Sequence, residues 1–146
     1  MRVNKNDVEL CLRVCEKITN EFGEFTPIYL YPEHKRVVPI VVTVKGLLDN
    51  GGIESLLSSQ LPGDPNLDLA IEAFKEIGCD EVVKIIQSVQ ALFPNKQLQE
   101  NDDERLAYYE LKPEELRDRL DSEFWAVSDN IIIALAKHIR LNNLDK

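Results

Sequence analysis

Apolar residues recur every three or four positions along most of this chain, which is the spacing of one face of an α-helix. In the first such stretch the apolar residues are Val8, Cys11, Leu12, Cys15, Ile18 and Phe22. Asn6 or Asp7 supplies an N-terminal cap, and Gly23 supplies a stop signal. The pattern therefore predicts a first helix from about Asn6 to Phe22.

The next segment, residues 24–38, has no clear period, and we expect a loop with at most one short strand. Pro39 is favourable as the first residue of a helix, which we expect to run to Leu48. The segment is rich in Val and Ile, so a buried strand is the alternative. Its position directly before Asn50-Gly51-Gly52 favours the helix.

Asn50-Gly51-Gly52 marks a sharp turn, because Asn and Gly adopt positive φ at low cost. A short helix from Ile53 to Gln60 follows, and Leu61-Pro62-Gly63 interrupts it. Asp64-Pro65 then opens a helix with a capping carboxylate and a proline in its first turn.

Gly78 predicts a tight helical hairpin, because one glycine separates two strongly periodic apolar segments. Asp80 caps the second of these helices, and Pro94-Asn95 stops it. Residues 96–111 read as a partly exposed polar segment, anchored by Leu106, Tyr108, Tyr109 and Leu111.

Pro113 begins a helix with acids in its first turn, where they oppose the helix dipole favourably. The last helix is expected from Ser122 to Leu141, with Trp125 packed inside. The sum is an all-α fold, a single-domain bundle of six or seven helices formed by residues 1–146.

Length and composition fit that picture, since 146 residues with 44% hydrophobic content suffice for one core. The N-terminus lacks the apolar stretch of a secretory signal. The longest apolar run, Val37 to Leu48, is too short to cross a bilayer. We therefore expect a cytoplasmic protein with no membrane partner.

The cysteines and histidines give no catalytic or metal signature. Cys11 and Cys15 lie one helical turn apart and could share a metal, but their apolar face favours a role as small hydrophobic core residues. His34 and His138 lack a neighbouring nucleophile, and Asp102-Asp103-Glu104 lacks the ligand spacing of a calcium loop. We expect no enzyme, no cofactor and no metal.

The charge distribution is more informative than the net charge of -9. Residues 1–49 hold seven acids and seven bases, whereas residues 50–146 hold nineteen acids and ten bases. The densest part, residues 100–129, holds eleven acids and four bases. Direct nucleic-acid binding needs Lys and Arg to neutralise phosphates, so a basic protein is the expected partner. Plain solubility is the alternative explanation.

Three segments carry a resemblance to a known family. They are the turn Asn50-Gly51-Gly52, the hairpin pattern Ala70…Ala73…Ile77-Gly78, and the stretch Leu120 to Trp125. Together they resemble a bacterial DNA-mimic protein family, acidic and all-helical, in which most members have no known function. The similarity covers about residues 47–142, with the N-terminal helix and irregular segment 1–46 packed on that region.

The resemblance implies an all-helical homodimer without a cofactor. The best-described relative presents carboxylates in place of DNA phosphates and occupies a transcription regulator. This chain departs from the family pattern after the glycine pair, where Ile53 replaces an aromatic residue and Ser55 and Ser59 replace polar Gln and Asn. Any recognition role of those positions is not carried over.

The expected function is thus an acidic protein-binding module that occupies the DNA-binding face of a basic protein. Its expected phosphate surrogates are Asp102, Asp103, Glu104, Glu114, Glu115, Asp118, Asp121 and Glu123. One alternative is a merely solvated face on which Glu114 and Asp118 pair with Arg117 and Arg119. Another is an immunity, antitoxin-like or adaptor protein that binds a basic partner through Tyr108, Tyr109 and Trp125.

Overall fold

The computed structural model describes residues 3–23, 25–59 and 63–146. These residues form six α-helices and two short 3-10 turns, and no strand occurs among them. The elements are α1 (Lys5–Phe22), η1 (Ile28–Leu30), α2 (Glu33–Leu57), α3 (Asp68–Glu76), α4 (Asp80–Ala91), η2 (Pro94–Lys96), α5 (Asp102–Glu110) and α6 (Glu114–Leu141). The predicted all-α bundle is confirmed.

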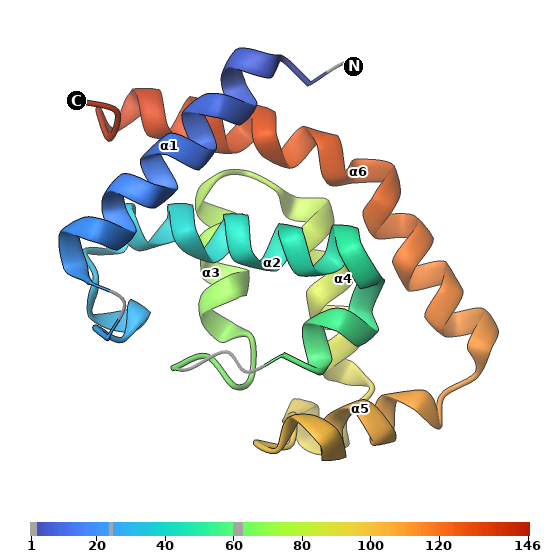
Figure 1. Cartoon of the computed structure of the whole chain (residues 1–146). Helices are drawn as coiled ribbons and strands as arrows, with labels where there is room; N and C mark the ends of the chain where they lie inside the picture. Colours follow the sequence, from blue (N-terminus) through green and yellow to red (C-terminus); the bar gives the residue numbers. More distant parts are fainter. Residues whose placement is uncertain (1–2, 24, 60–62) are drawn as a thin grey trace.

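Helix α2 crosses the middle of the molecule, and the other helices pack around it (Figure 1). It contacts α1, α3, α5 and α6. Five consecutive residues, Val37–Val41, are all buried, so this part of α2 is enclosed on every side. A helix that is apolar all round belongs in a core, and α2 is that core helix.

Burial also explains why α2 begins earlier than expected. The helix starts at Glu33, directly after Pro32, and Pro39 lies inside it rather than at its first position. The strand alternative for this segment is wrong. Proline inside a helix costs about 3 kcal/mol, and the burial of several Val and Ile side chains, each contributing about 1.5–3 kcal/mol, outweighs that cost.

The segment before α2 contains η1 in place of the expected loop or strand. Its anchor is Tyr31, whose ring stacks on Phe22 at a centroid distance of 4.8 Å. The Tyr31 hydroxyl donates to the Gly23 carbonyl over 3.2 Å. These contacts hold the end of α1 against the start of α2.

At the other end of α1 the cap is Asn4, not Asn6 or Asp7, because the Asn4 side chain accepts from the Asn6 N–H at 2.7 Å.

The predicted turn at Asn50-Gly51-Gly52 is a kink within α2. Gly52 has φ 69° and ψ -157°, and the helix resumes at Ile53 and ends at Leu57. The predicted end at Gln60 and the break at Leu61-Pro62 lie outside the described residues. Only glycine adopts the Gly52 backbone conformation without strain.

A carboxylate from α6 fills the space beside this kink. The Ile53 N–H donates to Asp121 Oδ1 over 2.8 Å. Gly52 is buried, and a Cβ at that position would lie 2.5 Å from the same oxygen. Asp121 therefore caps the resumed helix and fixes α6 against α2.

The helical hairpin forms as predicted, with Gly78 at φ 80° between α3 and α4. Two boundaries differ from expectation. Helix α3 begins at Asp68, yet the Asp64 carboxylate still accepts from the N–H groups of Leu69 and Ala70 at 2.8 and 2.9 Å. The residue that precedes α4 is Cys79, and Asp80 is the first helical residue.

The C-terminal part is more regular than the sequence suggested. Residues 96–111 contain helix α5, held by the buried residues Arg105 and Tyr109, whereas Leu111 is 81% exposed. The two helices expected beyond Pro113 are one continuous helix, α6, without a break near Ser122. That continuity aligns side chains from both halves of the helix.

We predict that Gly52→Ala lowers stability by more than about 2 kcal/mol, because a positive φ and a clash with Asp121 add together. Urea unfolding followed by circular dichroism measures the change. Gly46→Ala, in the same helix with open space around the added methyl group, is the matched control. It should leave stability unchanged or raise it by up to about 1 kcal/mol. Equal effects of the two variants would contradict the constraint at Gly52.

We predict that Gly78→Val lowers stability by about 1 kcal/mol or more, because valine at positive φ is strained. An added Cβ meets no atom within 4 Å, so the backbone alone causes the loss. Thermal unfolding tests this, and an unchanged melting temperature would refute it.

Candidate protein-binding surface

The continuous helix α6 places acids and one aromatic residue along a single line. Successive members stand four, three, four and four residues apart, so all share one helix face. The members of this α6 stripe are Glu114, Asp118, Asp121, Trp125 and Asp129. At 1.5 Å per residue the stripe is about 22 Å long. No Lys or Arg occupies a position in it.

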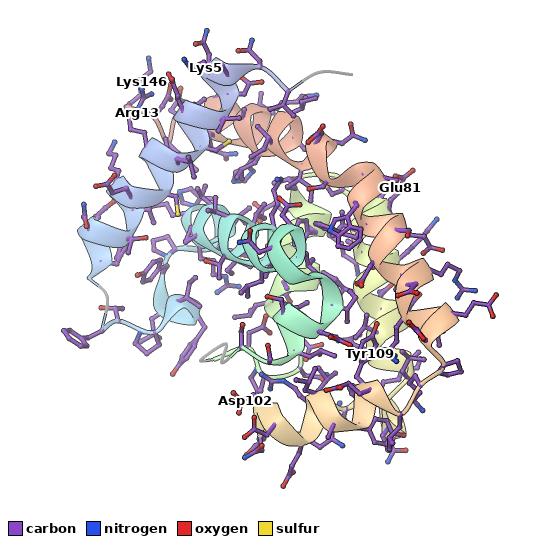
Figure 2. The ribbon with its side chains drawn as sticks, turned by 45° about the vertical axis from the view of Figure 1, so that its right-hand side comes forward. Lys5, Arg13, Glu81, Asp102, Tyr109 and Lys146 are labelled. Carbon is purple, nitrogen blue, oxygen red and sulfur yellow. The ribbon has the colours of Figure 1, made fainter. Side chains whose placement is uncertain are left out.

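Most of the predicted phosphate surrogates are exposed. Figure 2 shows the side chains from the side on which α5 meets α6. The exposed acids on these helices include Asp103, Glu104, Glu114, Glu115, Asp118 and Glu123, while Asp102 and Asp121 are half-buried.

The predicted surrogates fall into two groups rather than one. Asp102, Asp103 and Glu104 form the first turn of α5, and Figure 2 places Asp102 at the far end of α5 from Tyr109 and the start of α6. In that first turn they oppose the helix dipole favourably, and the Asn101 side chain caps the turn by accepting from the Glu104 N–H at 3.0 Å. The second group lies on α6.

Of the four bases within residues 100–129, three are at least half-buried and Arg119 is exposed. Arg105 is 3% exposed and donates only to backbone carbonyls, including Leu57 at 2.7 Å, Gln99 at 3.3 Å and Ser59. Burial lowers the pKa of its guanidinium. Lys112 lies over the Tyr108 ring, 4.7 Å from its centroid. Neither cation is an ion-pair partner for the surface acids.

The two remaining bases pair with other acids than expected. Arg117 pairs with Glu54 at 2.9 Å, and Arg119 pairs with Glu123 at 3.6 Å. The expected pairing of Glu114 and Asp118 with these arginines is therefore wrong. Arg117 also donates to the Lys112 carbonyl at 3.1 Å.

Five of the six exposed surrogate acids form no ion pair with any residue that the structure describes. They are Asp103, Glu104, Glu114, Glu115 and Asp118. Unpaired carboxylates of this kind repel one another and attract a basic surface.

Asp121 differs from the other surrogates. Its Oδ1 is occupied by the Ile53 N–H, and burial is the main cause of the raised pKa of its carboxyl group. Asp121 is thus mainly a structural residue, and only the solvent-exposed part of its carboxylate adds charge to the stripe. Sequence spacing alone could not distinguish it from Asp118.

Trp125 is not packed inside the bundle as predicted. It is 51% exposed, and its indole N–H donates to the Leu48 carbonyl over 3.0 Å. Asp129, one turn further along α6, is also exposed and was missed as a site residue. The absence of Gly and Pro from residues 114–141 was the signal that one helix would join them to the acids upstream.

The aromatic anchors of the immunity alternative do not form one exposed cluster. Tyr109 is 1% exposed, and Tyr108 is half-buried with its ring stacked on Phe93 at 5.1 Å. Trp125 is the exposed member of the three. A shaped aromatic interface built on both tyrosines is not supported by this arrangement.

The cysteines and histidines lie apart from this surface. Cys11 is buried, its thiol donates to the Ile132 carbonyl over 3.8 Å, and burial raises its pKa to about 11. The His138 ring nitrogen Nε2 lies 2.9 Å from the His34 carbonyl oxygen. Within the described residues no group of three or more His, Cys, Asp or Glu side chains is arranged to hold a metal ion.

None of the described helices has the length and apolar content needed to span a membrane.

The model of the family described as DMP19-like protein matches residues 30–142. No curated protein and no solved structure matches the chain. The matched region contains the Gly52 kink, the Gly78 hairpin and the whole α6 stripe. This chain therefore belongs to the DMP19-like protein family, as the resemblance of its turn and hairpin motifs predicted.

Proposed function

We propose that the acidic surface of α5 and α6 binds the DNA-binding face of a basic protein, such as a transcription regulator, in the cytoplasm. The observation that carries this proposal is the separation of charges. Of the bases in residues 100–129, Arg105 is buried and Lys112 and Arg117 are half-buried. Arg119 is exposed and pairs with Glu123, and the other exposed acids of this segment have no ion-pair partner among the described residues. Membership of the DMP19-like family supports the same role.

The spacing of the acids is compatible with partial mimicry. The four carboxylates of the α6 stripe are spread over about 22 Å, or roughly one charge per 6 Å of helix. One strand of duplex DNA carries a charge every 3.4 Å or so. The stripe thus reproduces a fraction of the charge of one strand, and the α5 acids add a second patch. Binding by such a surface is expected to be diffuse and sensitive to salt.

The proposed protein is a binding module rather than an enzyme, and it needs no cofactor for this role. A homodimer, which the family resemblance implies, would present two such surfaces. Its charge density would then be closer to that of duplex DNA than the charge density of one chain is. Sedimentation of the purified chain tests that oligomeric state independently of partner binding.

We predict that Glu114→Gln, Glu115→Gln and Asp118→Asn together weaken partner binding at least tenfold, whereas each single change has an effect of at most about 1 kcal/mol. Asp121 is left intact because its loss would disturb the Gly52 contact. The partner is first captured from host extract at low salt and purified, and affinity is then measured by calorimetry.

The matched control is Glu9→Gln, Glu16→Gln and Glu76→Gln. It removes three exposed acids that form no ion pair among the described residues and that lie on α1 and α3. It should bind as the wild type does. Duplex DNA should displace the wild-type protein from the same partner. A complex in which the partner holds DNA and this protein together would overturn the proposal, as would full affinity of the triple α6 variant.

A further inference from the structure

Trp125 occupies a position that a plain phosphate mimic would not need. It lies within the α6 stripe, with Asp121 four residues before it and Asp129 four residues after it. About half of its surface is open to solvent.

The indole ring is fixed rather than loose. Its N–H donates to the Leu48 carbonyl in the turn of α2 that precedes the Gly52 kink. Three residues further along α6, Ser128 donates its hydroxyl to Asp49 over 2.5 Å, and Lys45 pairs with the other oxygen of that carboxylate. Both α6 residues therefore bind the same turn of α2, and the indole hydrogen bond reduces the freedom that the ring would lose when a ligand binds.

The surroundings of the ring select the chemistry of its ligand. A guanidinium group stacks on an indole face by a cation–π interaction, and its N–H groups pair with carboxylates in the ring plane. Asp118, Asp121 and Asp129 lie on the same helix face at the distances of one and two turns. A flexible ammonium group would satisfy the carboxylates but would use the ring face less well.

We propose that Trp125 is a stacking platform for an arginine side chain of the basic partner, with Asp118 and Asp129 as the acidic rim. This inference deepens the proposed function and rests on it for the kind of partner. The acidic residues alone offer only charge, as DNA phosphates do. Trp125 would add an apolar ring face that excludes water, and it would favour partners that present arginine over those that present lysine.

The test uses hexa-arginine and hexa-lysine peptides as probes of equal charge. Trp125 is the one tryptophan of the chain, so its emission reports contact with the ring directly, while calorimetry gives the affinity. We expect hexa-arginine to change the emission saturably at low salt and to bind several times more tightly than hexa-lysine. Trp125→Leu should weaken hexa-arginine binding about fivefold, and Trp125→Phe should fall between that variant and the wild type.

Phe25→Ala is the matched control, since Phe25 is an aromatic residue 92% exposed and outside the stripe; it should bind both peptides as the wild type does. Melting temperatures of the Trp125 variants separate a lost contact from a lost fold, and Trp125→Phe keeps the ring if Trp125→Leu is unstable. The proposal is overturned by equal affinity of Trp125→Leu and wild type, by peptide saturation without a change in emission, or by the absence of peptide binding.

The two proposals fail in different ways. If DNA does not compete for the captured partner but arginine stacking on Trp125 is observed, the DNA-binding identity of the partner is wrong and the stacking platform stands. If DNA competes and the acidic triple variant fails to bind, but Trp125→Leu has no effect on either probe, the charge surface stands without the platform.

Discussion

The contact between Gly52 and Asp121 is the constraint on which the rest of this structure depends. Because Gly52 has no side chain and adopts a positive φ, a carboxylate of α6 reaches the backbone of α2 and accepts the N–H of Ile53. That single contact satisfies a backbone donor freed by the kink and sets the position at which α6 crosses α2. The exposed face of α6, with its acids and Trp125, follows from that crossing.

Burial of α2 is the second half of the same arrangement. The stretch Val37–Val41 of α2 is buried on every side and needs neighbours all round, and α2 contacts α1, α3, α5 and α6. The polar faces of these outer helices then form the surface. That surface is acidic because two nearby arginines are held by contacts with α2, whereas most of the neighbouring carboxylates are not. Arg105 of α5 donates hydrogen bonds to backbone carbonyls at the end of α2, and Arg117 pairs with Glu54 beyond the kink.

This partition of charge supports the proposed binding role more directly than the net charge does. Arg105 and Arg117 donate to backbone carbonyls, while Glu114, Glu115 and Asp118 stay exposed and form no ion pair among the described residues. The half-exposed Trp125 within the same line adds an apolar contact to an otherwise electrostatic surface.

The sequence by itself determined the helical class, the hairpin at Gly78, the acidic C-terminal half and the family motifs. These features depend on local periodicity, on backbone preferences of Gly and Asn, and on a simple count of charges. The positions of α1, α3 and α4 followed to within a few residues for the same reason. The stripe from Glu114 to Asp121 was also readable, since helix spacing is a local property.

Only the tertiary structure decided the start of α2, the continuity of α6 and the formation of α5. It also decided which charged side chains are buried, paired or exposed. Pro39 is tolerated inside a helix because packing on all sides outweighs a local penalty. Arg105 and Tyr109 are buried because α5 packs against α2, and no local sequence pattern predicts that contact. Asp121 and Asp118 look alike in sequence, but only one of them meets a glycine 69 residues away in the chain. Such differences arise from contacts between distant segments, and the packed core alone specifies them.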